Sequence, residues 1–343
     1  MLKTAVVGVG ALGWHHARLY QECANASLSG VFDTCPQRCA DIASKLGVRA
    51  YTNLAELAAD AQAVSVAVPA HHHFATARAL LQAGCHVLVE KPLTTQLEDA
   101  QELVVLARQN NRLLQVGHIE RFNPVVQALQ PHLEQPRFIE AHRLAGFPPP
   151  RPDLPPRGTE VGVVLDLMIH DIDLILSLVH SPLIHVDAVG VCILSSHEDL
   201  ANARLRFANG CVANLTASRV STKTMRTLRV FQDQAYLRLD CQSRQAEVFR
   251  KEGNRINHQA VEVGEHNALA EQLGSFVSSA LRAEQGLGLH APVDGREGLR
   301  ALEVAHRILA SIQAQAALNP PPRPPVELAL APGAPARTSS EIV

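Results

Sequence analysis

The sequence predicts a two-domain α/β protein, with an N-terminal doubly wound parallel sheet and a C-terminal α+β domain built on a large, mostly antiparallel open sheet. Up to about residue 120, short apolar runs alternate with helical patterns, as in right-handed βαβ units. From residue 185 to residue 250, extended runs follow one another without helices between them. The length of 343 residues is also typical of about two domains. We therefore expect domains at 1–120 and 121–318, followed by a proline-rich tail at 319–343.

The composition excludes several classes of protein. With 47% hydrophobic and 19% charged residues and a net charge of −2, the chain lacks the charge bias of a nucleic-acid-binding protein. Its apolar runs are broken well before the ~18 residues that a membrane helix needs, and the apolar N-terminus is too short for a secretory signal. Seven scattered cysteines without a C-x-x-C pair indicate neither a disulfide framework nor a zinc site. We expect a cytoplasmic protein with no nucleic-acid or membrane partner.

A glycine motif follows the first predicted strand, residues 3–7. It reads Gly8-Val9-Gly10-Ala11-Leu12-Gly13, and a helix is expected from residue 11 to about residue 24. In this context Gly8 allows the tight turn, Gly10 lets the backbone approach a pyrophosphate, and Gly13 lets helix and strand pack closely. The free N–H groups of the helix N-terminus, including those of Ala11 and Leu12, would face the phosphates. The motif predicts a dinucleotide site.

Asp33 ends the second predicted strand, residues 28–32, and lies 20 positions after Gly13. This is about the offset at which an acid accepts hydrogen bonds from the adenine ribose. A carboxylate there repels a 2′-phosphate, so NAD is favoured over NADP. Arg38 keeps NADP as the alternative, because an arginine just beyond the acid could tolerate that phosphate.

The βα alternation continues to a sixth strand. Helices are expected at 36–46, 54–59, 74–83 and 96–109, and strands near residue 50 and at 63–68, 86–89 and 112–116. Ligands of such sheets bind beyond the carboxyl ends of the strands, where Glu90-Lys91-Pro92 follows strand 86–89. Lys91 could serve there as acid, base or hydroxyl-orienting donor; the alternative is a surface Glu-Lys pair beside a turn. His71, His72 and His73 point in three directions on a helix start, so no metal site is predicted.

Asp166, His170 and Asp173 form a polar stripe on a predicted helix that is apolar almost all round. At about 100° per residue these three side chains share one face, while Asp171 points away from it. Such a helix is normally buried, and buried acids and imidazoles need partners. We expect the stripe to line a ligand cleft, with Asp173 as a structural anchor paired with the backbone or with a neighbouring base.

A proline-rich loop at 146–158 precedes this helix and contains Arg151 and Arg157. It is interpreted as a substrate lid whose arginines meet a diphosphate, or else as a solvated loop. In the second domain, strands are expected at 137–144, 185–194, 201–207, 212–218, 227–231, 235–239 and 246–250, and helices at 268–282 and 298–315. The tail from residue 319 is expected to be extended or disordered, or to wrap a neighbouring subunit.

These motifs together resemble those of the Gfo/Idh/MocA family of NAD(P)-dependent sugar and cyclitol dehydrogenases. The resemblance extends from residue 4 to about residue 313 and includes Pro69 with His73 four positions later, the run 83–92, and Asp166-x-x-x-His170-x-x-Asp173. It implies that the N-terminal domain is a Rossmann domain for NAD. It also implies that the open face of the C-terminal sheet packs against another subunit in a homodimer or homotetramer.

The resemblance also assigns roles to individual residues. It implies that Lys91 lies next to the nicotinamide, before a cis proline, and that Asp166 and His170 complete the catalytic set. Glu90, Pro69 and His73 would border the nicotinamide half of the cofactor. Substrate-binding residues implied or considered are Lys91, Arg121, Asn123, Arg143, Arg157, Asp166 and His170. His71 and His72 receive no role, because the family loop more often carries a single histidine.

Segments 117–124 and 166–173 resemble those of the branch that acts on nucleotide-activated amino sugars. The expected reaction is NAD-dependent oxidation of the 3-hydroxyl of UDP-N-acetylglucosamine, or of a related nucleotide sugar, to a 3-keto sugar used for lipid A. His170 would be the general base, because its usual pKa lies near working pH, and Lys91 would stabilise alkoxide character; which of the two is the base stays open. Alternatives are a dehydrogenase of an unactivated sugar or inositol, and a non-catalytic NAD-binding sensor, which would be expected to have lost this catalytic set.

Overall fold

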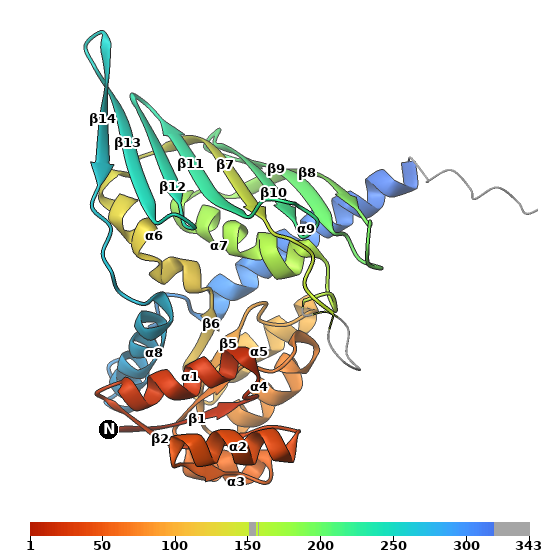
Figure 1. The fold of residues 1–343 in the computed structure, drawn as a ribbon, viewed down its shortest axis with the longest axis vertical. Coiled ribbons are helices and arrows are strands. Elements are labelled where there is room, and N and C mark those ends of the chain that lie inside the picture. Colours follow the sequence, from red (N-terminus) through yellow and green to blue (C-terminus); the bar gives the residue numbers. More distant parts are fainter. Residues whose placement is uncertain (151–155, 157, 319–343) are drawn as a thin grey trace, which may run out of the picture.

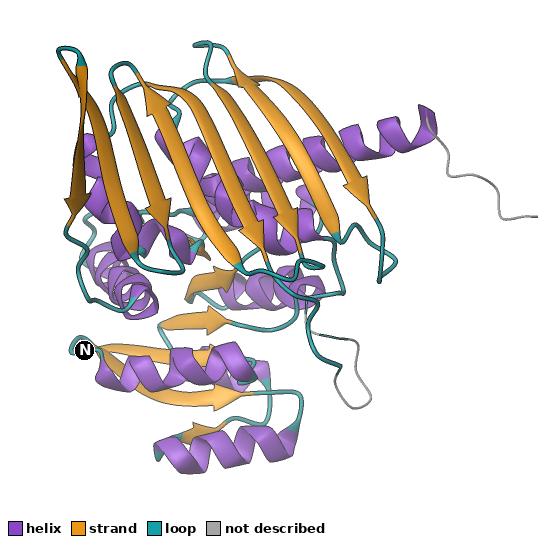
Figure 2. Ribbon diagram, turned by 45° about the horizontal axis from the view of Figure 1, so that its top comes forward, coloured by secondary structure: helices purple, strands orange, loops and turns teal. Residues whose placement is uncertain are grey.

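A computed structural model describes residues 1–150, 156 and 158–318. It contains two β-sheets, one parallel and one mostly antiparallel, each with its own helices (Figures 1 and 2). The predicted fold class is therefore confirmed. No helix within the described ranges is long and apolar enough to cross a bilayer.

The N-terminal sheet has six parallel strands in the order β3-β2-β1-β4-β5-β6. The strand order reverses between β1 and β4, and dinucleotides bind beyond the carboxyl ends of the strands at such a reversal. The strands are β1 (Leu2–Val7), β2 (Ala26–Phe32), β3 (Arg49–Ala50), β4 (Ala63–Val66), β5 (His86–Glu90) and β6 (Leu114–Gly117). The connecting helices are α1 (Ala11–Glu22), α2 (Pro36–Leu46), α3 (Leu54–Asp60), η1 (Ala70–His72), α4 (His73–Gln82) and α5 (Leu97–Gln109).

Every side chain of strands β4 and β5 is buried. Such continuous burial is typical of parallel strands that are covered by helices on both faces. Lys91 directly follows β5, so a buried strand fixes its main chain at the carboxyl edge of the sheet.

The second sheet has eight strands in the order β14-β13-β12-β11-β7-β10-β9-β8. Its strands are β7 (Pro136–Leu144), β8 (Leu183–Val191), β9 (Leu200–Phe207), β10 (Val212–Ser218), β11 (Met225–Gln232), β12 (Ala235–Asp240), β13 (Gln245–Glu252) and β14 (Arg255–Val261). Neighbouring strands are antiparallel except β7 and β10, which pair in parallel. The helices lie on one face of this sheet and leave the other face open (Figure 2).

The remaining helices follow β6 in the chain. They are η2 (Ile119–Phe122), α6 (Pro124–Leu129), η3 (Gln130–His132), η4 (Val164–Met168), α7 (Ile169–Leu178), α8 (Ala268–Glu284) and α9 (Gly295–Leu318). Helix α8 lies beside α1 (Figure 1) and buries Phe276 and Val277 in one cluster with Tyr20. Helix α8 therefore packs with the N-terminal domain, although the predicted range of that domain ended at residue 120.

Apart from the short 3-10 turns η1, η2 and η3, two elements were not predicted from the sequence. Strand β14 is exposed along almost its whole length and is mostly polar, so it has no alternating apolar pattern, as is common for an edge strand. Helix α6 is only six residues long, too short for a helical period to be recognised. The other predicted elements form, with ends that differ by a few residues.

Candidate active site

The glycine turn between β1 and α1 has the shape that a pyrophosphate needs. Gly8 has φ +83°, and a Cβ there would lie 2.8 Å from the carbonyl oxygen of Ala67. A Cβ on Gly13 would collide with the carbonyl oxygen of Gly8, whereas a Cβ on Gly10 would meet nothing within 4 Å. Gly8 and Gly13 therefore serve chain packing, and Gly10 leaves open space in front of the amides at the start of α1, those of Ala11 and Leu12.

Asp33 is held beside this turn at the end of β2. Its Oδ2 accepts from the main-chain N–H of Val9 at 2.9 Å, and its Oδ1 from that of Cys35 at 2.8 Å. The side chain of Arg38 is half-exposed, and its Nε lies 3.3 Å from Asp33 Oδ2. The structure thus places the predicted acid and the predicted arginine together next to the glycine turn.

Lys91 and Asp166 meet although 75 residues separate them in the chain. Lys91 Nζ donates to Oδ1 of Asp166 at 3.0 Å and to its main-chain carbonyl at 2.6 Å. The Lys91 side chain is 18% exposed, and the Lys91–Pro92 bond is cis. The carboxyl edge of the first sheet therefore presents a cation to the helix that carries Asp166.

The helix around Asp166 begins with a π-helical turn, Val164–Met168, before regular α-helix starts at Ile169. The sequence predicted a straight α-helix here, so this turn is wider than predicted. Single π-turns inside α-helices are frequent at functional sites. The carbonyl oxygen and the carboxylate of Asp166 both face Lys91, and both accept hydrogen bonds from it.

His170 lies on the next turn and is half-buried. Burial, followed by the positive charges of Lys91 and Arg143, lowers the pKa of His170 well below its ordinary value. Within the described part of the chain, its buried Nδ1 has no hydrogen-bond partner. The imidazole is therefore neutral at neutral pH and is able to accept a proton.

His118 is a buried imidazole that sequence reasoning left without a role. It follows β6 directly, and both of its ring nitrogens are buried without a partner among the described residues. Burial first of all lowers its pKa, so it too is neutral at neutral pH. The rule that ligands meet the carboxyl ends of parallel strands would have singled it out.

His73 joins the two loops that follow β4 and β5. Its Nδ1 lies 2.7 Å from the carbonyl oxygen of Pro92, and its Nε2 lies 3.0 Å from that of Val68, beside Pro69. Glu90 is buried and lies 3.1 Å from the Nε2 of His16. Burial alone would raise the pKa of Glu90, but the contact with His16 and the positive charge of Lys91 outweigh it and lower that pKa.

Arg121 and Asn123 are engaged within the protein. Arg121 pairs with Asp173 through Nε and Nη2 at 2.7 and 2.9 Å and also reaches Glu297 at 2.9 Å. Asp173 is thus anchored by a neighbouring base, as predicted. Asn123 caps α6 by accepting from the main-chain N–H of Val125 at 3.0 Å. Contact of Arg121 or Asn123 with substrate stays a prediction that this arrangement does not support.

Arg143 was considered as a phosphate ligand, and the structure corrects this interpretation. It is buried, pairs with Asp171 at 2.8 and 3.0 Å and reaches Glu120 at 2.9 Å. These carboxylates accept hydrogen bonds from all three of its guanidinium nitrogens, so Arg143 neutralises buried acids and has no nitrogen left for a phosphate. Arg157 and Arg151, which were also considered, lie outside the described residues.

The histidines at 71 and 72 do not join His73. Both are exposed, and their ring centroids lie 4.0 Å apart with the rings tilted by 51°, while His73 is buried. No group of three His, Cys, Asp or Glu residues within the described ranges is arranged to hold a metal ion.

Comparison with known proteins links this site to an enzyme class. A family model described as an oxidoreductase family with an NAD-binding Rossmann fold matches residues 2–118, and a GFO/IDH/MocA C-terminal domain matches residues 132–238. UDP-N-acetylglucosamine 3-dehydrogenase of Acidithiobacillus ferrooxidans is 35% identical over 322 residues, which cover 91% of this chain and 98% of that protein. A solved structure of that enzyme covers the same shares, with a TM-score of 0.83.

Two further relatives are inositol dehydrogenases. Inositol 2-dehydrogenase of Corynebacterium glutamicum is 31% identical over 191 residues, which cover 54% of this chain and 56% of that protein. A solved inositol dehydrogenase homologue from Azotobacter vinelandii, complexed with NADH and myo-inositol, is 22% identical over 91% of this chain and 96% of its own, with a TM-score of 0.78. At that identity the likeness is one of fold alone.

Proposed function

Because this chain belongs to the Gfo/Idh/MocA family of NAD-dependent oxidoreductases, we propose that it oxidises the 3-hydroxyl of UDP-N-acetylglucosamine, or of a closely related nucleotide sugar, to a 3-keto sugar. The observation that carries this choice of substrate is the identity to a UDP-N-acetylglucosamine 3-dehydrogenase along nearly the whole of that enzyme. Its product, once aminated at C3, would be a precursor for lipid A.

NAD fits the carboxyl edge of the N-terminal sheet. The glycine turn with open space at Gly10 would hold the pyrophosphate, and Asp33 would accept from the adenine ribose hydroxyls. A 2′-phosphate would meet the Asp33 carboxylate, which favours NAD over NADP. When bound, NAD supplies the acceptor for the hydride that leaves the sugar carbon.

The chain's own residues would handle the hydroxyl proton. A lysine ammonium has three N–H donors, and Asp166 takes two of those of Lys91, through its carbonyl and its carboxylate. The third has no partner among the described residues and would be available to the substrate hydroxyl, whose alkoxide character it would stabilise. His170, kept neutral by its lowered pKa, would take the proton, and Asp166 would fix the direction of Lys91.

The enzyme is proposed to be a homo-oligomer that assembles through the open face of the second sheet. An aromatic ladder crosses five strands on this face, with ring centroids 5.7, 4.7, 5.1 and 4.5 Å apart, and is made of Phe138, Phe231, Tyr236, Phe249 and His258. On β8 at the far edge, Val189 and Val191 are 50% and 44% exposed. Exposed aromatic and aliphatic side chains gathered on one face of a sheet are typical of a protein interface.

The proposal is tested by incubating the purified protein with NAD and a set of sugars, and following the absorbance of reduced nicotinamide. The set includes UDP-N-acetylglucosamine, UDP-N-acetylgalactosamine, free N-acetylglucosamine and myo-inositol. Reduction of the product with borodeuteride, followed by NMR, locates the oxidised carbon. We expect deuterium at C3 of the nucleotide sugar. Turnover of myo-inositol alone would refute the proposal and favour the second candidate, an inositol dehydrogenase, which the partial relatives support.

A further inference from the structure

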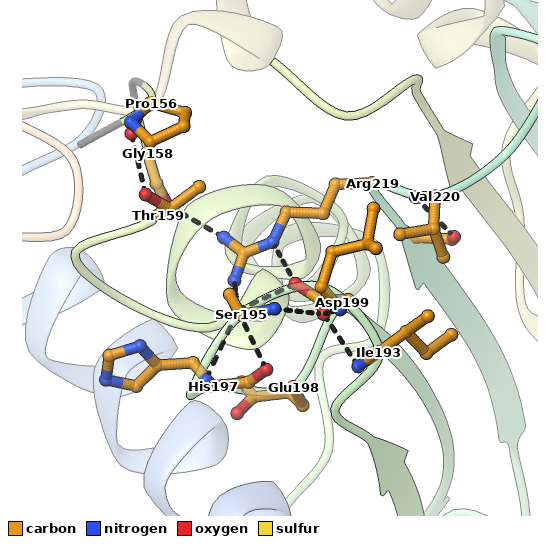
Figure 3. Close-up of polar contacts among 12 residues, drawn as sticks. Pro156, Gly158, Thr159, Ile193, Ser195, His197, Glu198, Asp199, Arg219 and Val220 are labelled. Carbon is orange, nitrogen blue, oxygen red and sulfur yellow. Dashed lines mark hydrogen bonds and ion pairs between the residues drawn. The ribbon is translucent and has the colours of Figure 1, made fainter. Parts of the chain in front are cut away.

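Arg219 is a buried arginine that the proposed chemistry does not use. It lies directly after β10, its side chain is 3% exposed, and its Nε lies 2.7 Å from Oδ1 of Asp199, which is fully buried (Figure 3). Oδ2 of Asp199 accepts from the main-chain N–H groups of Ile193, Leu194 and Ser195 at 2.8, 2.5 and 3.0 Å. Burial alone would raise the pKa of Asp199, but Arg219 and these N–H groups hold that pKa well below its ordinary range.

The other nitrogens of Arg219 bind a second segment of the chain. Nη1 donates to the carbonyl oxygens of Gly158 and Val161 at 2.8 and 2.9 Å, and Nη2 donates to Oγ of Ser195 at 2.8 Å. Figure 3 shows the guanidinium between the turn around Ser195 and the segment that contains Gly158. Arg219 therefore ties the end of the long loop to the turn at 193–199.

The segment held by Arg219 touches Asp166. Gly158 has φ +81°, and a Cβ there would lie 2.6 Å from Oδ2 of Asp166. The main-chain N–H of Asp166 donates to the carbonyl oxygen of Gly162 at 3.0 Å. Residues 158–162 thus border both the carboxylate and the main chain of Asp166, whose other oxygens bind Lys91.

The turn at 193–199 also holds the start of the helix that carries Asp166 and His170. The main-chain N–H of Val163 donates to the carbonyl oxygen of Glu198 at 3.0 Å, and that of Val164 to its carboxylate at 3.3 Å. A carboxylate near the N-terminus of a helix also interacts favourably with the helix dipole. Asp199 follows Glu198 directly, so a single turn fixes both Arg219 and the helix start.

We propose that Arg219, fixed by Asp199, is a positioning residue for the reaction: it holds residues 158–162 against Asp166 and so keeps the Asp166 carboxylate on Lys91. The inference rests on the roles proposed above for Lys91 and Asp166. A buried ion pair adds little net stability, because desolvation offsets the attraction. Stability alone therefore does not explain the Arg219–Asp199 pair, whereas positioning of Asp166 does.

The first test compares Arg219→Met with a matched control, Arg137→Met. Arg137 lies on the same sheet, is exposed and pairs with Asp233 at 2.9 Å. Because a displacement of ~1 Å at the reacting groups can cost ~100-fold, we expect Arg219→Met to lower kcat by about 100-fold with little change in KM. Arg137→Met should keep the wild-type kcat. Trp14, the single tryptophan, follows the glycine turn, and its fluorescence should report an unchanged Kd for NAD in both variants.

A second readout needs no substrate. Reductive methylation followed by peptide mass spectrometry measures how accessible Lys91 is, with the exposed Lys3, Lys45, Lys223 and Lys251 as internal references. In Arg219→Met, Lys91 should be methylated faster relative to these references, because the Asp166 carboxylate no longer holds it. This result would support the positioning role even if no sugar in the set were oxidised, so failure of the proposed substrate is distinguishable from failure of this inference.

A third variant covers the case in which Arg219→Met does not fold. Gly158→Ala keeps the Arg219–Asp199 pair and places a methyl group against the Asp166 carboxylate. It should also lower kcat with an unchanged Kd for NAD and faster methylation of Lys91. Wild-type kcat and wild-type methylation of Lys91 in Gly158→Ala, or in a folded Arg219→Met, would overturn the proposal. So would a loss of activity in Arg219→Met that lies entirely in NAD binding.

Discussion

Gly10 and Gly13 belong to the same motif, but Gly10 leaves space for the cofactor whereas Gly13 allows α1 to pack against β1. Two alanine substitutions should separate these roles. Gly10 has φ −66° and ψ −160°, which alanine also adopts, and its Cβ would meet nothing within 4 Å. Gly10→Ala should therefore fold normally. It should even gain about 0.4–1 kcal/mol in the free energy of unfolding, because alanine has less conformational freedom than glycine in the unfolded chain.

NAD binding should respond in the opposite direction. The methyl group of Gly10→Ala would occupy the space through which the pyrophosphate approaches the start of α1. Crowding of this kind costs about 1–3 kcal/mol, which corresponds to a rise in Kd of roughly 5-fold to 150-fold. Isothermal titration with NAD measures the change in Kd, and urea unfolding monitored by far-UV circular dichroism measures the change in stability.

Gly13→Ala is the matched control for packing. Its Cβ would collide with the carbonyl oxygen of Gly8, so α1 must shift away from β1, and the free energy of unfolding should fall by about 1–3 kcal/mol or more. The reasoning is refuted if Gly10→Ala binds NAD as tightly as the wild type, or if Gly13→Ala is as stable as the wild type. Either result would mean that the two glycines are not divided between cofactor and fold.

Four further predictions concern His170, Asp171 and the open face of the second sheet. His170→Ala should lower kcat by about 100-fold or more; an unchanged rate would remove His170 from the chemistry. Because burial and Lys91 lower the pKa of His170, the base stays neutral as pH falls, so the acidic limb of kcat/KM should lie below the ordinary value of about 6.5, and a limb above it would contradict the assignment. Asp171→Ala leaves Arg143 buried with one carboxylate fewer and should cost about 3–5 kcal/mol in urea unfolding. Tyr236→Glu should dissociate the oligomer in light scattering after gel filtration, whereas Arg38→Met should not.

The candidate site is built from segments that lie far apart in the sequence. The cofactor half comes from the carboxyl edge of the first sheet, and Asp166 and His170 come from a helix packed under the second sheet. Lys91 links the two halves by its hydrogen bonds to Asp166. Substitutions at the Lys91–Asp166 contact should therefore affect turnover more than binding of NAD, whose adenine half is proposed to bind at Asp33.

Local patterns were enough for most of the fold and for the cofactor half of the site. A buried parallel strand such as β5 is a continuous apolar run, and helix α2 has a helical period that ends at the left-handed Gly47, so both were predicted within a residue of their ends. The glycine turn and Asp33 lie within one βαβ unit, where spacing along the chain fixes spacing in space. The polar edge strand β14 has no such pattern and was missed.

Arginine partners could not be predicted in this way. Arg121 and Arg143 looked available for a phosphate, yet their carboxylates lie 23 to 176 residues away along the chain. No role was predicted for Arg219, because its role depends on Asp199 and on two carbonyl oxygens about 60 residues upstream.

The sequence by itself therefore determined the fold class, the family and the dinucleotide turn, because each depends on residues a few positions apart. Only the tertiary structure decided that Lys91 binds Asp166, that the helix opens with a π-turn, and which arginines are already paired. The ion pairs depend on long-range contacts between charged groups, and whether a charge meets a ligand or a buried partner is set by how distant elements pack.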